Sequence, residues 1–267
     1  MATRPAPAIA KTELAGVLLV DKPAGLTSHD VVSRVRRATG SSRVGHAGTL
    51  DPFATGLLVT LVGRGTRLMP YIDGEPKVYD AVIEFGAETA TDDVTGAITR
   101  TAPPPDDAAI AEAVRRLTGT IEQLPPAFSA KQVGGVRAYA AARRGSPLEL
   151  AASDVTVFEW RAVERTGDRL AARITCSGGT YIRALARDLG RASGSAAHLA
   201  SLRRVASGPF AVSDANTVDD LAIGHFNLRP LREAIPGLPM QTIDGNELAR
   251  VAHGTTIESR VAGERVA

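Results

Sequence analysis

Stretches with the two-residue period of β-strands outnumber helical stretches in this chain, and the two kinds do not alternate regularly. The clearest strand is 79–85, where tyrosine, alanine, isoleucine and phenylalanine occupy alternate positions. Shorter strands are expected at 16–21, 155–160 and 170–176. This order favours an α+β fold, with a mixed, largely antiparallel central sheet flanked by helices, over a doubly wound parallel sheet.

Three helices are expected around this sheet. In the first, Thr27 and Asp30 have the spacing of a capping box, and Gly40 can end the helix. A second helix is expected over about 106–117, after three consecutive prolines. A third is expected over about 182–189, where the apolar residues fall on one helical face.

Composition indicates a soluble globular protein, with 44% hydrophobic and 22% charged residues. No stretch approaches the roughly eighteen consecutive apolar residues of a membrane helix, so no membrane association is expected. The single cysteine, Cys176, excludes an internal disulfide framework and a multi-cysteine metal site, and it suits a reducing cytoplasm. A chain of 267 residues can form one large core, or one large and one small domain.

Net charge is a weak indicator of function here, because 31 basic and 29 acidic residues leave only +2. The basic residues are nearly all arginine, whose guanidinium suits bidentate contacts with phosphate. A genome rich in arginine codons would give the same composition. Clustered arginines remain candidates for a phosphate-binding face: Arg34, Arg36, Arg37 and Arg43; Arg143 and Arg144; Arg183, Arg187 and Arg191; Arg203 and Arg204.

Common cofactor motifs are absent from the sequence. It contains no GxxxxGK[ST] loop, GxGxxG loop, HExxH helix or nucleophile elbow, and its five histidines show no metal-ligand spacing. We therefore expect neither a cofactor nor a metal, and we disfavour nucleotide hydrolysis, hydride transfer and zinc chemistry.

Two local patterns suggest a functional site. Residues 45–58 hold closely spaced glycines, His46 and Asp51 between apolar stretches, although an ordinary Asp-Pro turn would look the same. If Thr180 is the N-cap of the third helix, Arg183 lies in its first turn, where the helix dipole disfavours a cation. Arg183 should then face an anion, or else be a solvated arginine without a role.

Taken together, six ordered motifs resemble the TruB-type tRNA pseudouridine synthases. The resemblance extends from about residue 16 to residue 210. The motifs are GVLLVDKPAGLTSHDVV, VGHAGTLDPFATGLL, the KVY that begins the 79–85 strand, PPAFSAKQVGGVRAY, GGTYIRALARDLG and SLRRVASGPF.

The resemblance implies a role for each matching residue. Asp51 would be the essential catalytic carboxylate, Arg183 its opposing charge, and Tyr79 the aromatic that stacks on the flipped base and accepts the proton from C5. Substrate-binding residues would be His46, which enters the space left by the base, with Tyr181, Leu202, Gly48 and Lys22. RNA phosphates would be bound by Arg43, Arg143, Arg144, Arg203 and Arg204.

The implied reaction is the isomerisation of a T-loop uridine of tRNA, at position 55, to pseudouridine. It moves the bond to C1′ from N1 to C5 of uracil without gain or loss of atoms, so no cofactor is required. Asp51 could attack the base, attack the sugar or remove a proton beside C1′, and the sequence does not choose among these routes. The implied protein is a cytoplasmic monomer that binds the T arm of tRNA, without a metal or a membrane.

The resemblance also suggests a division of the chain. Residues 1–12 would be a disordered arm, 13–236 the catalytic domain with a subdomain at about 97–153, and 237–267 a short C-terminal segment related to RNA-binding domains. One position departs from the family pattern SAxKxxG: Gln132 occupies the place of its lysine, and Lys131 precedes it.

Two other functions compete with this interpretation. A non-catalytic RNA-binding module or tRNA chaperone could use the same scaffold, although retention of Asp51, Tyr79 and Arg183 argues for an enzyme. A nucleoside hydrolase or glycosidase would require a second carboxylate near Asp51, which Asp92 or Asp93 could supply.

Overall fold

The computed structural model describes residues 14–72, 74–129, 131–146 and 148–261. The arm expected at 1–12 lies outside these residues. The strands are β1 (Gly16–Lys22), β2 (Val44–His46), β3 (Thr55–Val62), β4 (Lys77–Phe85), β5 (Ala87–Thr89), β6 (Ile98–Thr101), β7 (Gly119–Gln123), β8 (Gln132–Val133), β9 (Val136–Arg137), β10 (Ser153–Thr166), β11 (Arg169–Cys176), β12 (Ala197–Ser207), β13 (Phe210–Ala211) and β14 (Asn216–Thr217). The α-helices are α1 (Ser28–Thr39), α2 (Asp107–Arg116), α3 (Ala138–Arg143), α4 (Ile182–Ala192), α5 (Val218–Ala222) and α6 (Gly245–Ala252), and the 3₁₀ helices are η1 (Gly63–Tyr71), η2 (Val212–Asp214) and η3 (Leu231–Ala234).

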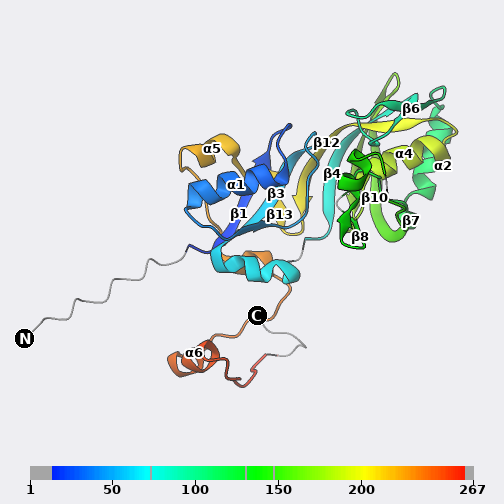
Figure 1. Cartoon of the computed structure of the whole chain (residues 1–267). Coiled ribbons are helices and arrows are strands. Elements are labelled where there is room, and N and C mark those ends of the chain that lie inside the picture. The colour runs from blue at the N-terminus through cyan, green and yellow to red at the C-terminus, as the bar shows by residue number, and fades with distance from the viewer. Residues whose placement is uncertain (1–13, 73, 130, 147, 262–267) are drawn as a thin grey trace, which may run out of the picture.

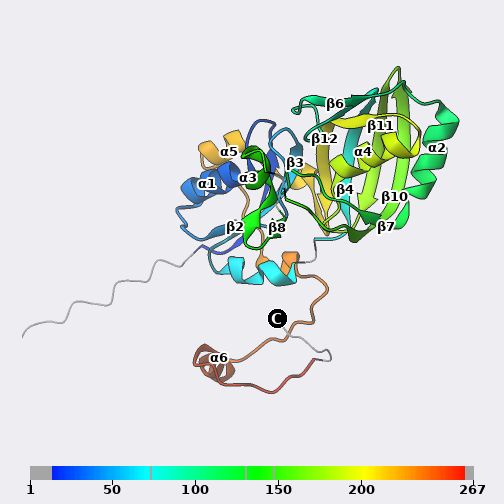
Figure 2. The same cartoon turned by 45° about the vertical axis from the view of Figure 1, so that its right-hand side comes forward.

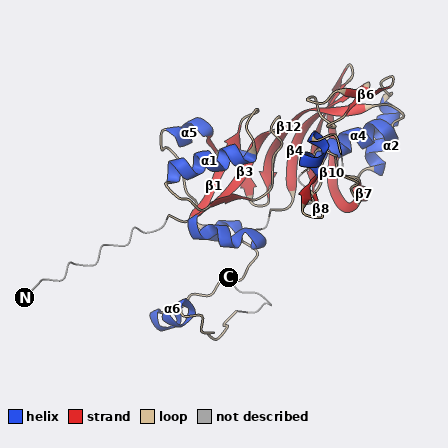
Figure 3. Ribbon diagram, viewed as in Figure 1, coloured by secondary structure: helices blue, strands red, loops and turns tan. Residues whose placement is uncertain are grey.

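Ten of these strands form one mixed sheet in the order β14-β1-β3-β12-β4-β11-β10-β7, with β2 beside β3 and β13 beside β12 (Figure 3). Most pairs are antiparallel, whereas β12 runs parallel to β3 and β14 runs parallel to β1. The expected α+β fold with a largely antiparallel sheet is therefore confirmed. Because β12 lies between β3 and β4, it joins two half-sheets. One half-sheet consists of β14, β1 and β3, and the other consists of β4, β11, β10 and β7.

Helices cover this sheet at both ends, as Figures 1 and 2 show. At the end containing β1 and β3, α1 and α5 pack on one side through a core that includes Val31, Val35 and Leu221. The other side of the same strands packs against residues of η1 and η3, among them Met69 and Ala234. At the far end, α4 and α2 pack on the core side of β4, β10, β11 and β12.

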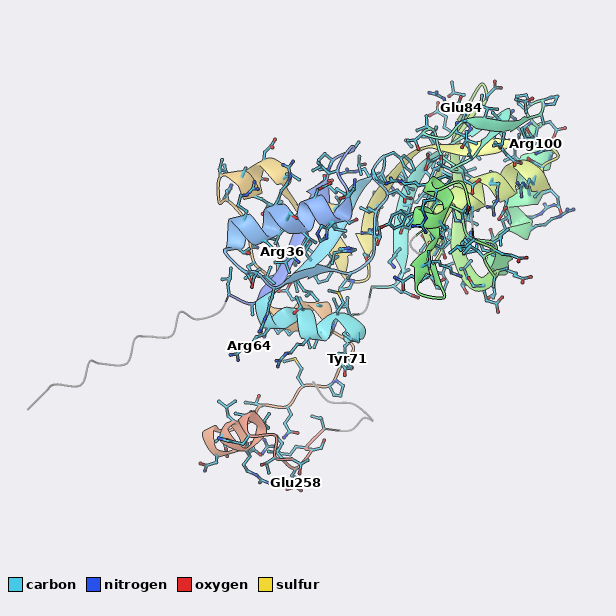
Figure 4. All side chains as sticks on the ribbon, viewed as in Figure 1. Arg36, Arg64, Tyr71, Glu84, Arg100 and Glu258 are labelled. Atoms are coloured by element: carbon cyan, nitrogen blue, oxygen red, sulfur yellow. The ribbon has the colours of Figure 1, made fainter. Side chains whose placement is uncertain are left out.

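The first helix has the expected ends. Thr27 caps α1 by accepting a hydrogen bond from the Asp30 amide, Asp30 reciprocates, and Gly40 ends the helix in a left-handed conformation at φ 64°. Arg36, labelled in Figure 4, extends from α1 to β2 and donates to the Val44 carbonyl at 3.3 Å. This contact attaches the strand before the Asp51 turn to the helix.

The third expected helix, α4, begins at Ile182 as expected, but its N-cap lies one residue later than Thr180. Tyr181, and not Thr180, is the N-cap of α4, and no side chain of the cap residue satisfies the helix amides. Instead, Gln123 at the end of β7 accepts from the Tyr181 amide at 2.8 Å and donates to the Tyr181 carbonyl at 3.1 Å. A strand distant in the sequence thus fixes the start of the helix.

Residues 237–261 lie apart from the sheet, with α6 in a separate segment that includes Glu258 (Figures 1 and 4). The segment expected as a subdomain, 97–153, contributes to the main body, because β7 pairs with β10 and Ile110 of α2 lies in the main core. Among the described residues, no helix has both the length and the apolar character needed to cross a membrane.

Candidate active site

The turn that contains Asp51 connects β2 to β3 and is anchored on both sides. Leu50 both donates to and accepts from the Ser28 hydroxyl of α1, at 2.9 and 3.1 Å. Ala47 donates to the Val59 carbonyl of β3 at 2.9 Å, and Gly48 has φ 96°, a conformation that favours glycine. These contacts hold the Asp51 backbone in one position.

Lys22 supports the same turn from inside the protein. Its side chain is 0% exposed, and Nζ donates to the carbonyls of Pro23, Leu26 and Pro52 at 3.0, 2.8 and 3.4 Å. Burial lowers the pKa of Lys22 to about 8, and the neighbouring Asp51 opposes this effect. The direct contact between Lys22 and substrate stays a prediction; in the structure the ammonium is surrounded by protein carbonyls.

Arg183 and Asp51 form a bidentate ion pair. Arg183 Nε lies 2.9 Å from Asp51 Oδ2, and Nη2 lies 3.0 Å from Oδ1. The guanidinium also donates to the carbonyls of Thr91 and Phe128, at 2.7 and 2.9 Å. The Arg183 side chain is 4% exposed, whereas that of Asp51 is 32% exposed. The arginine is therefore fixed inside the protein, while the carboxylate remains accessible.

Two further carboxylates belong to this network, and the sequence patterns assign them no role in it. Asp93 Oδ2 lies 3.7 Å from Arg183 Nη1, and Asp92 Oδ2 lies 3.0 Å from Arg187 Nη1. Burial raises the pKa of Asp92, although Arg187 counteracts the rise. Two features of the sequence could have indicated these ion pairs: the acidic turn 91–96, and Arg187 one helical turn after Arg183. Both acids therefore face arginines of α4.

Aromatic and apolar side chains expected to surround the uracil lie on neighbouring elements. Tyr79 in β4 is 6% exposed, and Leu202 in β12 is 7% exposed and pairs with Ala81 of β4. Tyr181 is half-buried immediately before α4. Burial raises the pKa of both tyrosines.

His46 ends β2 and is half-buried. Its Nδ1 atom is buried without a hydrogen-bond partner, and burial lowers the pKa of the ring. Burial thus favours the neutral imidazole, which suits a group that contacts a base better than one that binds phosphate.

The arginines expected to bind RNA divide into exposed and buried groups. Arg43, Arg143 and Arg144 are exposed, and Arg143 stacks over the Tyr139 ring at 5.8 Å. Arg203 is partly exposed but makes a bidentate pair with Asp21 at 2.7 and 3.0 Å. Arg204 is 1% exposed, and its contact with RNA phosphates stays a prediction.

Residues 131 and 132, at which the sequence departs from the family pattern SAxKxxG, lie at the start of the hairpin of β8 and β9. Lys131 donates to the Ser153 hydroxyl at 3.1 Å, and Gln132 is exposed. Within the described residues, no group of three or more histidine, cysteine or acidic residues could hold a metal ion.

Comparisons with known proteins agree over nearly the whole chain. Residues 36–182 match the TruB family pseudouridylate synthase N-terminal domain, and residues 183–238 match the tRNA pseudouridylate synthase B C-terminal domain. A tRNA pseudouridine synthase B of Thermobifida fusca is 49% identical, over 91% of this chain and 86% of that protein. That of Nocardia farcinica is 43% identical, over 97% and 87%.

Solved structures of more distantly related proteins are similar to this chain in fold. A Cbf5–Nop10–Gar1 complex contains a chain with TM-score 0.67 and 26% identity, covering 90% of this chain and 67% of that one. An H/ACA ribonucleoprotein bound to a substrate RNA containing 2′-deoxyuridine gives TM-score 0.65 and 25% identity, with 91% and 67% coverage.

Proposed function

Because this chain belongs to the TruB family of tRNA pseudouridine synthases, we propose that it isomerises the T-loop uridine at tRNA position 55, with Asp51 as the catalytic carboxylate. The observation that supports this proposal most directly is the bidentate Asp51–Arg183 pair. It places an accessible carboxylate on a fixed turn and balances its charge with a buried guanidinium.

The reaction makes a specific demand on such a site. The N1–C1′ bond must break, the uracil must rotate, and C5 must bond to C1′ before the C5 proton is lost and N1 gains a proton. A uracil that enters the site excludes water from Asp51, and a carboxylate without a counter-ion would resist that desolvation. Arg183 offsets this cost, so Asp51 remains ionised for attack on the base or sugar, or for proton removal beside C1′.

Neighbouring residues would hold the flipped nucleotide. In this proposal Tyr79 stacks on the uracil and accepts the C5 proton, and Tyr181 and Leu202 line the rest of the pocket. Gly48 allows the turn to approach the substrate closely, since its φ of 96° excludes most other residues without strain. His46 fills the space that the base leaves in the RNA.

The RNA itself would be held by its phosphates. We assign this role to the exposed residues Arg43, Arg143 and Arg144, together with the outward side of Arg203, because the major groove of A-form RNA is too deep and narrow for side chains to read. Residues 13–236 would form the catalytic domain of a cytoplasmic monomer, and residues 237–267 would add a short RNA contact.

The proposal is tested by incubating an unmodified tRNA transcript with the wild type and with Asp51→Asn, followed by mapping of each nucleoside. We expect pseudouridine at position 55 with the wild type and none with Asp51→Asn. A second transcript with cytidine at position 55 should remain unmodified.

Other products would identify the competing functions. Release of free uracil would indicate a hydrolase, and tRNA binding without any change in nucleosides would indicate a binding module. Pseudouridine at another position would refute the T-loop assignment alone, while equal product from Asp51→Asn would refute the role of Asp51.

A further inference from the structure

Arg204 has an unusual environment for an arginine. It is among the largest fully buried side chains and only 1% exposed. Within the part of the chain that the structure describes, no carboxylate lies within ion-pairing distance of its guanidinium. Charged groups are almost never fully buried unless they are paired. A buried arginine without a carboxylate partner therefore indicates that its position has a structural or functional requirement for this side chain.

The guanidinium donates to three backbone carbonyls of the Asp51 turn and the strand that follows it. Nη2 donates to Gly48 at 3.1 Å, Nη1 to Thr49 at 3.5 Å, and Nε to Leu57 of β3 at 2.7 Å. These three contacts fasten the residues immediately before Asp51 to the first part of β3.

The backbone of Arg204 is equally close to this region. Gly56 pairs with Arg204 across the parallel β3–β12 ladder, and a Cβ at position 56 would lie 2.3 Å from the Arg204 carbonyl oxygen. The close approach of the two strands brings the guanidinium beneath the turn.

On its other side, Arg204 pairs with Tyr79 across β12 and β4. Burial raises the pKa of the Tyr79 hydroxyl, whereas the charge of Arg204 and a hydrogen bond from it both act in the opposite direction. The other charged or titratable groups near the phenol are Cys176 of β11 and Asp51 of the turn, and each raises its pKa further. Arg204 is therefore the group in this environment that favours an ionised Tyr79.

We propose that Arg204 is a positioning residue of the reaction, which locks the Asp51 turn onto β3 and stabilises the ionised Tyr79 hydroxyl that takes the proton from C5. In that step the C5–H bond breaks and its proton moves to the Tyr79 oxygen. The electron pair forms the C5=C6 double bond, the C6=N1 double bond opens, and N1 takes a proton from solvent. The part of the inference that concerns proton transfer rests on the role of Tyr79 in the proposed function.

The test replaces Arg204 with glutamine in the full-length protein and follows tyrosinate absorbance against pH. The same measurement on Tyr79→Phe identifies which part of the signal belongs to Tyr79 among the four tyrosines of the chain. An opposite charge at hydrogen-bond distance shifts a pKa by about 1–3 units, so the Tyr79 transition of Arg204→Gln should move upward by at least about one unit. Circular dichroism at each pH shows that the fold persists over the range compared.

Arg173→Gln is the matched control. Arg173 makes a bidentate pair with Asp80, the residue after Tyr79, on the opposite side of the sheet, at 2.7 and 2.8 Å. Its loss removes an arginine from a neighbouring strand without altering the site. Both the Tyr79 transition and turnover should remain at wild-type values.

Arg204→Lys separates the two parts of the inference and also serves if Arg204→Gln does not fold. The lysine retains a positive charge, but its single nitrogen cannot take the places of Nε, Nη1 and Nη2 at once. Turnover should therefore fall at least about tenfold, while its dependence on pH should follow that of the wild type. An unchanged Tyr79 transition in folded Arg204→Gln, or an equal shift in Arg173→Gln, would overturn the inference about Arg204. Full turnover by Tyr79→Phe would instead overturn the proposed role of Tyr79, while the titration shift would still establish the contact with Arg204.

Discussion

Replacement of Arg183 by lysine tests whether the geometry of the ion pair, and not only its charge, is required. Arg183 makes two hydrogen bonds to Asp51 and one each to the carbonyls of Thr91 and Phe128. A lysine has three N–H donors on a single nitrogen, so it must lose at least one of these four contacts. Each hydrogen bond from a charged group contributes about 1.5–3 kcal/mol.

The loss at the site is therefore at least about 1.5–3 kcal/mol, and water reduces the part that involves Asp51, whose side chain is 32% exposed. We take about 2 kcal/mol, which corresponds to roughly thirtyfold lower turnover at about 1.4 kcal/mol for each factor of ten. Single-turnover conversion of tRNA measures this effect, and a separate binding assay shows whether tRNA affinity has changed.

Arg173→Lys is the control, since Arg173 and Asp80 form a bidentate pair of the same chemistry with side chains that are 46% and 44% exposed. An exposed pair contributes only about 0–1 kcal/mol, so turnover should remain within about twofold of the wild type. If Arg183→Lys keeps more than about a third of wild-type turnover while folded, the fixed bidentate geometry is not required.

Three further variants test other features. His46→Ala should reduce conversion of folded tRNA more than conversion of a flexible T-loop fragment, and equal losses would contradict its role in RNA deformation. Gly56→Ala should lower the free energy of unfolding in urea by about 1–3 kcal/mol more than Gly86→Ala. The two glycines have nearly the same φ, 102° at Gly56 and 104° at Gly86. A Cβ would lie 2.3 Å from a backbone oxygen at position 56 but 4.0 Å from one at position 86. The wild type should gain stability relative to Lys22→Met as the pH rises from 8 to 10.5. In that range the unfolded state binds one proton more than the folded state, because the pKa of Lys22 is about 8 when folded and 10.5 when unfolded. A parallel pH dependence of the stability of both proteins would show that Lys22 titrates normally.

Features set by local sequence could be predicted well. The alternation in β4 places Tyr79 on the core side, and the spacing of Thr27, Asp30 and Gly40 gives both ends of α1. The expectation that Arg183 should face an anion came from its place at a helix start, and the structure brings Asp51 to it.

Features that depend on distant partners could not be predicted. No pattern indicated β12, because its pairing with β4 shifts register at two points and Arg204 is buried within it. A strand with bulges and an inward arginine does not show the alternation of a half-buried strand. The contacts of Lys22 with substrate and of Arg204 with RNA stay predictions. The sequence did not indicate that backbone carbonyls surround both side chains, because the fold brings those carbonyls together.

The central place of β12 has a consequence for synthesis of the protein. Thr55 and Arg203, which pair across β3 and β12, are separated by 148 positions in the chain. A nascent chain that ends at residue 196 would contain Asp51, Tyr79 and Arg183, yet its two half-sheets would have no strand between them and would expose open edges prone to aggregation. Catalytic competence therefore arises late in translation, when residues 197–207 leave the ribosome and close the gap.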